Sequence, residues 1–389
     1  MTTHSTRPLY ISGTALIHRV EGVGVYTRRL LAGLTRHAPE LAWKLIVPED
    51  LAEAGNEAAP GKTVVAPVFP RFRRSLLREI GGARAVSAHL QRIAPDALLL
   101  CTYDFHSFSP PGRVCQVIHD CLPERFPQDN GGGLLRRWYR QRCLAWARGA
   151  DRVLTGSQWS ARDLETIGRI APERIAVVPA WLDTPFAQRP NDAQIASVRE
   201  RLGLPASYLL YVGGFRRYKA VDRLLQAYAL ARRSASLPPL VLAGRIPAAP
   251  ARTRSTDINA CLASLGLDRS AVLCPGFIPD ADLPAVYAGA KLFVYPSLHE
   301  GFGYSPAEAI AMGTPVLVSN RASLPEVAPA RNCQFDPDNT DELAAKIQEA
   351  VAAPAQFLQA SSLTFQEPAG ISRFVAALAP LLSTKSLSR

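Results

Sequence analysis

The sequence predicts an α/β fold built from two doubly wound, Rossmann-like domains. The chain has 389 residues, which is too long for one ordinary hydrophobic core and suits two domains. Short apolar runs of strand type alternate with helical segments along the chain. The stretch from Leu292 to Asn320 is typical of this pattern, because it combines a strand, a turn-rich loop, a helix and a second buried strand.

The composition indicates a globular protein. Hydrophobic residues make up 48% and charged residues 20% of the chain, which excludes a disordered protein. No apolar run reaches membrane-spanning length, and the first ten residues lack the apolar core of a signal peptide. The seven cysteines are dispersed, without a CxxC pair, which suggests reduced thiols and no metal cluster. These features predict a cytoplasmic protein.

The formal net charge of +11 comes mainly from arginine, since only six of the 44 basic residues are lysine. An arginine-favouring genome is one explanation. Contact with phosphates or with an anionic membrane surface is another. No basic motif with interleaved aromatic residues is visible, so we expect no nucleic-acid partner.

In the first half, seven short apolar runs are expected to be strands. They are Leu9–Ser12, Lys44–Val47, Thr63–Ala66, Asp96–Leu100, Cys115–Ile118, Val153–Thr155 and Ile175–Val178. Helices are expected at about Val25–His37, Pro70–Ala94 and Leu134–Arg148, and after Ser157, a typical N-cap. The basic segment Pro70–Ala94 is either an ordinary surface helix or one that docks on anionic lipid. Gly81-Gly82 argues against one long helix there.

The second half follows a linker at Pro179–Pro185 and repeats the alternation. Strands are expected at Tyr208–Val212, Leu240–Ala243, Val272–Cys274, Leu292–Tyr295 and Val316–Val318. Helices are expected from about Asp192, after Lys219, and at Asp257–Leu265, Pro306–Met312, Thr340–Ala352 and Gly370–Leu382. Thr340 or Asp341 is the expected cap of the helix that ends at Ala352.

Two carboxylates, Glu300 and Glu308, bracket the loop and first helical turn of the Leu292–Asn320 stretch. Gly301 and Gly303 between them let the backbone approach a ligand. A helix N-terminus attracts phosphate, and a carboxylate accepts hydrogen bonds from neighbouring sugar hydroxyls. The arrangement therefore suits a sugar nucleotide. The alternative is an ordinary βαβ crossover whose glutamates face solvent.

Three further sites carry weaker signals. Gly22 and Gly24 come just ahead of a helix, where a backbone can approach a diphosphate. His119-Asp120 ends a strand, where ligands bind in doubly wound sheets, although a lone histidine is more often structural. Gly213-Gly214 turns sharply at a strand end, and Lys219 nearby is suited to neutralising a departing diphosphate.

Four segments resemble one family. HEGFGYSPAEAIAMGTPVLVSN resembles the E-x7-E signature of the retaining GT-B glycosyltransferases of family 4, and GFIPDADLPAVYAGAKLFVYPS matches the same family upstream. EGVGVYTRRLLAGL resembles the family's GGIGRYT-type segment, and VIHDCLPERFP resembles its VHDxxPxxxP segment. The resemblance covers most of the chain. It implies the GT-B fold, in which two Rossmann-like domains face a deep cleft.

The resemblance also implies residue roles. Glu308 would hold the nucleotide ribose, Glu300 the transferred sugar, and His119 the sugar or the incoming hydroxyl, so His119, Glu300 and Lys219 are the expected catalytic residues. The expected donor-binding residues are Gly22, Gly24, Asp120, Gly213, Gly214, Arg217, Phe277, Ile278, Gly301, Phe302, Gly303, Tyr304 and Glu308. Phe277 and Ile278 would abut the base. At the two family positions for an arginine beside the diphosphate, this chain has Gly214 and Tyr218, so Arg217 or Arg216 would substitute. In the linker, Ala180-Trp181 replaces the family's Asn-Gly.

The implied organisation is an acceptor domain at 1–183, a nucleotide-sugar domain at 184–369 and a C-terminal helix at 370–389 that returns to the first domain. The implied function is transfer of a hexose, with retention at the anomeric carbon, to a hydroxyl of a glycan or lipid-linked acceptor in cell-surface polysaccharide synthesis. The donor expected first is GDP-mannose, which would supply mannose. No cofactor or metal is expected, and the leaving diphosphate would take the acceptor proton. The basic helices could contact the acceptor or the inner membrane face. The alternatives are a UDP-sugar donor, an epimerase or hydrolase of the same fold, and a non-catalytic scaffold.

Overall fold

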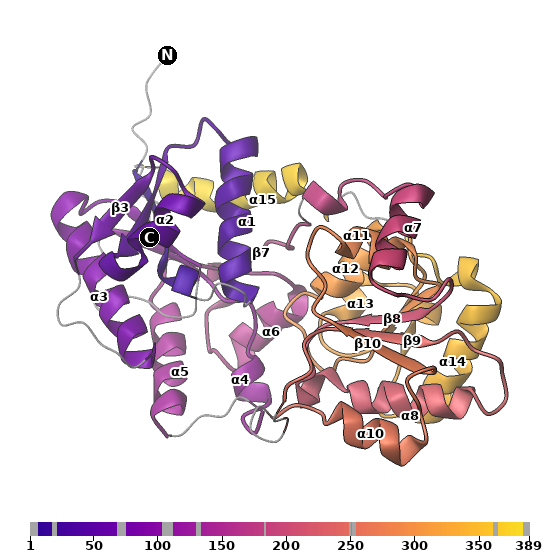
Figure 1. Cartoon of the computed structure of the whole chain (residues 1–389). Coiled ribbons are helices and arrows are strands. Elements are labelled where there is room, and N and C mark those ends of the chain that lie inside the picture. Colours follow the sequence, from indigo (N-terminus) through magenta and orange to yellow (C-terminus); the bar gives the residue numbers. More distant parts are fainter. Residues whose placement is uncertain are drawn as a thin grey trace.

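The computed structural model comprises two α/β domains (Figure 1). It describes residues 7–17, 22–67, 75–102, 112–129, 134–182, 184–248, 250, 254–360 and 365–383. The strands of the described ranges form two sheets, each with parallel strands throughout. The predicted fold class is therefore confirmed.

The first domain is built on a seven-stranded sheet of order β3-β2-β1-β4-β5-β6-β7. Its strands are β1 (Leu9–Ser12), β2 (Trp43–Pro48), β3 (Thr63–Ala66), β4 (Leu98–Cys101), β5 (Arg113–Val117), β6 (Arg152–Thr155) and β7 (Ile175–Val177). Its helices are α1 (Gly22–His37), α2 (Ala52–Ala58), α3 (Ser75–Ile93), α4 (Leu122–Arg125), α5 (Leu134–Ala147) and α6 (Gln158–Thr166). The inner strands are buried because helices cover both faces of the sheet, which is why they are continuous apolar runs, whereas the edge strands β3 and β7 are partly exposed.

The second domain is built on a six-stranded sheet of order β10-β9-β8-β11-β12-β13. Its strands are β8 (Leu209–Val212), β9 (Leu240–Ala243), β10 (Val272–Gly276), β11 (Leu292–Tyr295), β12 (Val316–Ser319) and β13 (Gln334–Phe335). Its helices are α7 (Asp192–Arg201), α8 (Val221–Ala231), α10 (Ile258–Leu265), α11 (Leu283–Ala288), α12 (Tyr304–Ala311), α13 (Leu324–Val327) and α14 (Thr340–Ala352). The strand order changes direction between β8 and β11. Sheets of this kind bind ligands at such a switch point.

The last helix, α15 (Glu367–Leu382), packs on α1 of the first domain (Figure 1). Gly33 of α1 allows this approach, because a Cβ atom there would lie 2.5 Å from Cδ1 of Ile371. The buried carboxylate of Glu367 accepts a 2.7 Å hydrogen bond from Nη2 of Arg36. Close packing and a charged pair therefore join the last described helix to the first.

The linker carries a buried tryptophan. The Trp181 side chain is 1% exposed and packs against Tyr26 of α1 and Phe374 of α15, with ring centroids 5.8 and 6.2 Å away. A Cβ atom on Gly370 would lie 2.6 Å from Cβ of Trp181. Trp181, which stands where the family has glycine, is thus packed against Gly370 of α15.

Three expectations about the elements need correction, and one strand was not expected. Helix α3 runs unbroken through Gly81-Gly82, because Gly82 packs closely on Pro48, where a Cβ atom would lie 3.2 Å from Cγ. Its expected first turns, 70–74, lie outside the described residues. Helix α1 begins at Gly22, so Gly24 lies within its first turn. Asn339 caps α14, accepting the N–H of Glu342, in place of Thr340 or Asp341. Strand β13 was not predicted, because it is two residues long.

Candidate active site

A cavity of about 500 Å³ lies between the two domains. Residues that follow β5 and β11 line it from opposite sides, as expected for the carboxyl ends of parallel strands. Nine of the residues singled out in the sequence line this cavity: Gly22, His119, Asp120, Lys219, Glu300, Gly301, Phe302, Gly303 and Tyr304. Segments far apart in the chain thus meet at one site.

An ion pair stands at the wall formed by the second domain. Nζ of Lys219 lies 2.6 Å from Oε1 of Glu300 and donates a 2.9 Å hydrogen bond to the hydroxyl of Tyr295. The two charged side chains are only 13% and 15% exposed. Burial lowers the pKa of Lys219, but the neighbouring Glu300 and three tyrosines raise it, and the net pKa lies well above the ordinary value. Lys219 is therefore held as a cation facing the cavity.

Backbone hydrogen bonds fix the two loops that carry this pair. The carbonyl of Tyr218 accepts the N–H of Leu298 at 2.7 Å, which joins the lysine loop to the glutamate loop. The hydroxyl oxygen of Ser323 lies 2.9 Å from the carbonyl oxygen of Glu300 and 2.8 Å from that of Phe302, so its single proton is shared between the two. The positions of Lys219 and Glu300 are thus set by their backbones and do not depend on the ion pair alone.

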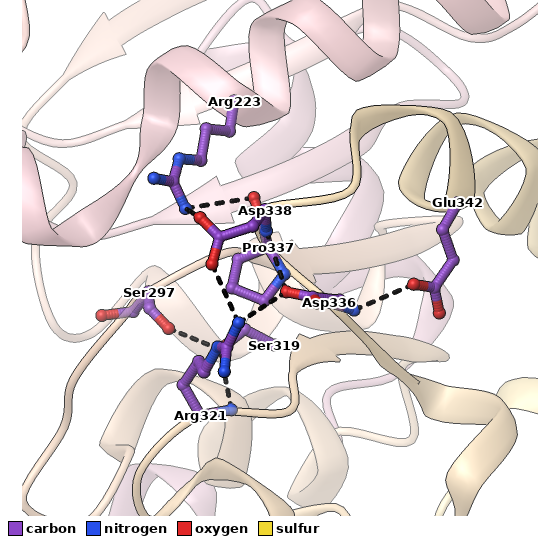
Figure 2. A network of polar contacts seen from close by, with 8 residues as sticks. All are labelled: Arg223, Ser297, Ser319, Arg321, Asp336, Pro337, Asp338 and Glu342. Atoms are coloured by element: carbon purple, nitrogen blue, oxygen red, sulfur yellow. Dashed lines mark hydrogen bonds and ion pairs between the residues drawn. The ribbon is translucent and has the colours of Figure 1, made fainter.

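A polar network lies beside the loop that leads from β11 to Glu300 (Figure 2). Ser319, at the end of β12, donates to the carbonyl of Ser297, whose own hydroxyl donates to the carbonyl of His299 at 3.1 Å. Arg321 donates to Asp336 and Asp338, both at 2.8 Å. Arg223 of α8 lies 2.6 Å from Asp338. The network ties the ends of β11, β12 and β13 to α8 and so stiffens the loop ahead of Glu300.

Glu308 is the fifth of the eight residues of α12 and is 7% exposed. Its Oε2 accepts a 3.0 Å hydrogen bond from the hydroxyl of Tyr287. Burial and then the charge of Glu308 raise the pKa of Tyr287 well above its ordinary value, so this hydroxyl keeps its proton and donates. Nη2 of Arg29, from α1 of the first domain, lies 3.9 Å from Oε1. Glu308 does not line the cavity itself, although its neighbours Tyr304 and Ser305 do.

His119 and Asp120 face the ion pair from the first domain. The imidazole of His119 contacts the Tyr26 ring edge to face, with centroids 4.6 Å apart. Oδ1 of Asp120 accepts the N–H of Leu122 at 2.9 Å, which starts α4. Asp120 therefore has a local structural task besides lining the cavity. A Cβ atom on Gly301 would collide with the carbonyl oxygen of His119, so glycine is required for the two domains to meet here.

Direct hydrogen bonds join the domains beside the cavity. The hydroxyls of Ser157 and Ser160 donate to the carbonyl of Gly301 at 2.7 and 3.1 Å. The carboxylate of Glu326 accepts the backbone N–H groups of Gln158 and Trp159, both at 2.8 Å. A carboxylate from the second domain thus sits on the N-terminus of α6, where a negative charge is stabilised. Ser157 also caps α6 as predicted, accepting the N–H of Ser160 at 3.0 Å.

Family models match both domains. Residues 20–186 match the model described as "Glycosyltransferase Family 4", and residues 206–353 match the one described as "Glycosyl transferases group 1". Together they take in every described residue that lines the cavity. The chain belongs to the family 4 glycosyltransferases. The resemblance found in the sequence is therefore confirmed.

Two relatives of this glycosyltransferase are mannosyltransferases of Escherichia coli. The serotype-specific mannosyltransferase WbdA is 30% identical over 313 residues, which cover 75% of this chain and 37% of WbdA. The O-antigen chain mannosyltransferase B is 32% identical over 246 residues, which cover 61% of each chain. The match thus spans little more than a third of WbdA and less than two thirds of the second relative.

The GT-B fold is confirmed by likeness to solved structures. HepE of Anabaena, solved in complex with UDP and glucose, superposes with a TM-score of 0.69 at 17% identity, over 96% of this chain and 99% of HepE. Within the described ranges, no helix of the glycosyltransferase has both the length and the apolar character needed to cross a bilayer.

Several expected donor-binding residues lie outside the cavity lining. Gly24 is buried in α1. Gly213 packs against Gly244 at the end of the neighbouring strand, where a Cβ atom on Gly244 would collide with the carbonyl of Gly213. Gly214 is exposed. The side chain of Arg217 is exposed, while Nη1 of the exposed Arg216 donates to the Asp129 carbonyl at 3.4 Å. Neither arginine lines the cavity of the glycosyltransferase.

The two residues expected at the base differ in exposure. The Phe277 side chain is 64% exposed at the end of β10, where a planar base could stack on it. Ile278 is 4% exposed and belongs to the core of the second domain. Contact of Phe277 and Ile278 with the base stays a prediction.

Sequence reasoning missed four residues of this site: Tyr26, Arg29, Tyr287 and Tyr295. Tyr26 lines the cavity, but the sequence indicated only that it lies in the helix expected at Val25–His37. Tyr295 ends an expected strand and Tyr287 lies in the upstream segment that resembles the family, and both are buried. Arg29 carried no signal, because its contact with Glu308 spans the two domains.

Across the part of the chain that the structure describes, no three His, Cys, Asp or Glu side chains gather as metal ligands. All seven cysteines lie in that part and none forms a disulfide. The expected independence from metal and cofactor stays a prediction.

Proposed function

We propose that this chain transfers a mannosyl group from GDP-mannose to a hydroxyl of a glycan or lipid-linked acceptor, with retention at the anomeric carbon. One observation carries the proposal. The Lys219–Glu300 pair faces His119 across a cavity between the domains of a family 4 glycosyltransferase. The donor sugar is inferred from the two relatives, which are mannosyltransferases.

The reaction breaks the bond between the anomeric carbon and the β-phosphate oxygen and forms one to the acceptor oxygen. The acceptor proton passes to the leaving diphosphate. Lys219 would stabilise the negative charge that builds on that diphosphate, which is where electrostatic help acts most strongly. Glu300 would accept hydrogen bonds from the hexose hydroxyls, and His119 would orient the hexose or the incoming hydroxyl.

Glu308 would hold the ribose. Its second oxygen is already engaged by Tyr287 at 3.0 Å, which orients the carboxylate. Its Oε1, which lies 3.9 Å from Nη2 of Arg29, would accept from the ribose hydroxyls. The N-terminus of α12 would lie beside the diphosphate, because the backbone N–H groups at a helix N-terminus attract phosphate. Contact with an anionic membrane face remains part of the proposal, since it would bring the chain to a lipid-linked acceptor.

A thermal-shift panel tests the donor. GDP, UDP, ADP and dTDP and their sugar conjugates would be added without metal, and a ligand that binds only the folded chain raises the melting temperature. A shift with GDP and GDP-mannose supports the proposal. A shift with UDP ligands alone supports a UDP-sugar donor instead. No shift with any ligand favours a non-catalytic scaffold.

Product analysis separates the transferase from an epimerase or hydrolase of the same fold. Incubation with GDP-mannose and no acceptor should leave the donor intact. Release of free mannose or an epimerised donor would contradict the transferase assignment. The anomeric configuration of an acceptor product, read by NMR, tests retention.

A further inference from the structure

Arg29 reaches from the first domain to the expected nucleotide site of the second. It lies on α1, and its Nη2 is 3.9 Å from Oε1 of Glu308. Its Cζ lies 5.0 Å from the ring centroid of Tyr304, the first residue of α12. The side chain is 13% exposed. A desolvated cation of one domain is thus held at the N-terminal turns of a helix in the other.

The charges around the cavity suggest what this cation does. Lys219 stands beside Glu300, and Arg29 stands beside Glu308, so two cations accompany two carboxylates. A nucleoside diphosphate brings further negative charge, which needs cations in the site. Among the residues that the structure describes, Lys219 is the only lysine or arginine lining the cavity. A second cation must come from close by.

The positions where the family carries that second cation do not supply it here. They hold Gly214 and Tyr218, and the nearby side chains of Arg216 and Arg217 are exposed outside the cavity lining. Arg29 does not line the cavity either, but it is little exposed and lies beside Tyr304, a cavity-lining residue at the N-terminus of α12, where the diphosphate is expected. Its planar fork of donors also suits phosphate oxygens better than a single ammonium does.

We propose that Arg29 is the second diphosphate-binding cation of the donor site, supplied by the opposite domain. The inference rests on the proposed function, in which Glu308 holds the ribose. When ribose hydroxyls occupy Glu308, the Arg29 guanidinium turns from the carboxylate to the diphosphate. Each charged group then exchanges one partner for another, and none is left buried without one. The nucleotide consequently contacts both domains.

The competing explanation is that Arg29 only joins the two domains. Comparison of a charged with a neutral ligand separates the two explanations. A diphosphate contact affects GDP but not guanosine, which has the same base and ribose without phosphate. A purely structural role disturbs the site as a whole, so it weakens both ligands together or neither.

The experiment measures GDP affinity by calorimetry and guanosine affinity by ligand-observed NMR on the full chain. Variants are Arg29→Gln and Arg29→Lys, with Arg137→Gln, an exposed arginine of α5, as control. Arg29→Gln should weaken GDP about tenfold or more, the loss expected for a hydrogen bond to a charged group. Guanosine affinity should change by less than about twofold, and Arg29→Lys should recover part of the GDP affinity. Arg137→Gln should bind as the unaltered chain does.

Unchanged GDP affinity in Arg29→Gln, or equal losses for GDP and guanosine, would overturn the inference while leaving the proposed function intact. If the unaltered chain binds UDP in place of GDP, the same comparison is made with UDP and uridine. An unaltered chain that binds no nucleotide overturns the proposed function and the inference with it. Should Arg29→Gln fail to fold, Arg29→Lys decides: it should still weaken GDP selectively, because the fork is lost while the charge remains.

Discussion

The carboxylate of Glu326 accepts the backbone N–H of Trp159 at 2.8 Å, although the two residues belong to different domains. The same carboxylate accepts the N–H of Gln158 at 2.8 Å. It therefore occupies the N-terminus of α6 much as a bound anion would. Next to it, Gly301 packs against His119, so this contact holds the two walls of the cavity at a fixed separation.

Glu326→Ala should loosen the cavity without unfolding either domain. Glu326 is exposed, so we expect less than about 1 kcal/mol of lost unfolding free energy. The larger effect should be an increased radius of gyration in small-angle X-ray scattering and a raised KM for the donor. Glu349→Gln, an exposed glutamate of α14, is the control. Identical scattering from Glu326→Ala and the unaltered chain would show that the contact does not hold the domains.

Lys219→Gln should lower turnover strongly. Removing the cation beside Glu300 should reduce kcat on the order of 100-fold, the loss typical of one electrostatic group at a reacting centre. It also leaves a little-exposed carboxylate without its nearest cation, so unfolding free energy should fall by about 3 kcal/mol. Steady-state kinetics and chemical denaturation measure the two effects. A kcat within about threefold of the unaltered chain would remove Lys219 from the mechanism.

The Lys219–Glu300 pair also predicts a pH dependence. The folded-state pKa of Lys219 is raised, so its stabilisation is complete below the unfolded value of about 10.4 and is lost as pH rises through the folded value. The difference in unfolding free energy between the unaltered chain and Lys219→Gln should therefore stay constant from pH 7 to pH 9. A difference that shrinks across this range would mean that Lys219 loses its proton there.

Trp181→Ala should destabilise the packing between the linker, α1 and α15. Truncation of a fully buried tryptophan leaves a cavity and should cost about 3–5 kcal/mol of unfolding free energy. Because Tyr26 packs on both Trp181 and His119, turnover should fall in the same variant. Trp138→Ala is the matched control, since Trp138 is 53% exposed. Equal melting temperatures for the two variants would contradict the packing described for Trp181.

Tyr287→Phe should weaken donor binding with little loss of stability. The variant removes the hydroxyl that orients Glu308, at a cost of about 1 kcal/mol for one hydrogen bond. We expect a several-fold higher donor KM and an unchanged kcat. Tyr208→Phe loses a similar buried hydrogen bond, to the carbonyl of Val286, and should leave donor KM unchanged. If both variants alter KM alike, Tyr287 has no particular link to the donor.

Much of the fold could be predicted because buried parallel strands are continuous apolar runs with turn residues at both ends. The predicted bounds of β1, β3, β9 and β11 agree with the structure to the residue. Gly81-Gly82 was misleading, because its helix-weakening propensity is overridden by packing on Pro48. Strand β13 is too short to leave any periodicity.

The residues of the candidate site also differ in how well the sequence could predict them. Glu300 and Lys219 could be found because each lies in a local motif with a recognisable spacing. Their pairing could not, since 81 residues separate them and only the meeting of β8 and β11 brings them together. Arg29 was invisible for a stronger reason. Its nearest carboxylate belongs to another domain, and nothing in the spacing along α1 distinguishes Arg29 from a solvated arginine.

The return of α15 to α1 makes the second domain an insertion in the first. A single cut in the linker cannot release two independent lobes, because the first would lose the helix that covers Leu30, Leu34 and Trp181. Loss of α15 would therefore destabilise the first domain, although the second domain is the one that precedes α15 in the sequence. To keep α1 and α15 on one piece, a version of this chain that is split in two would first have to be circularly permuted.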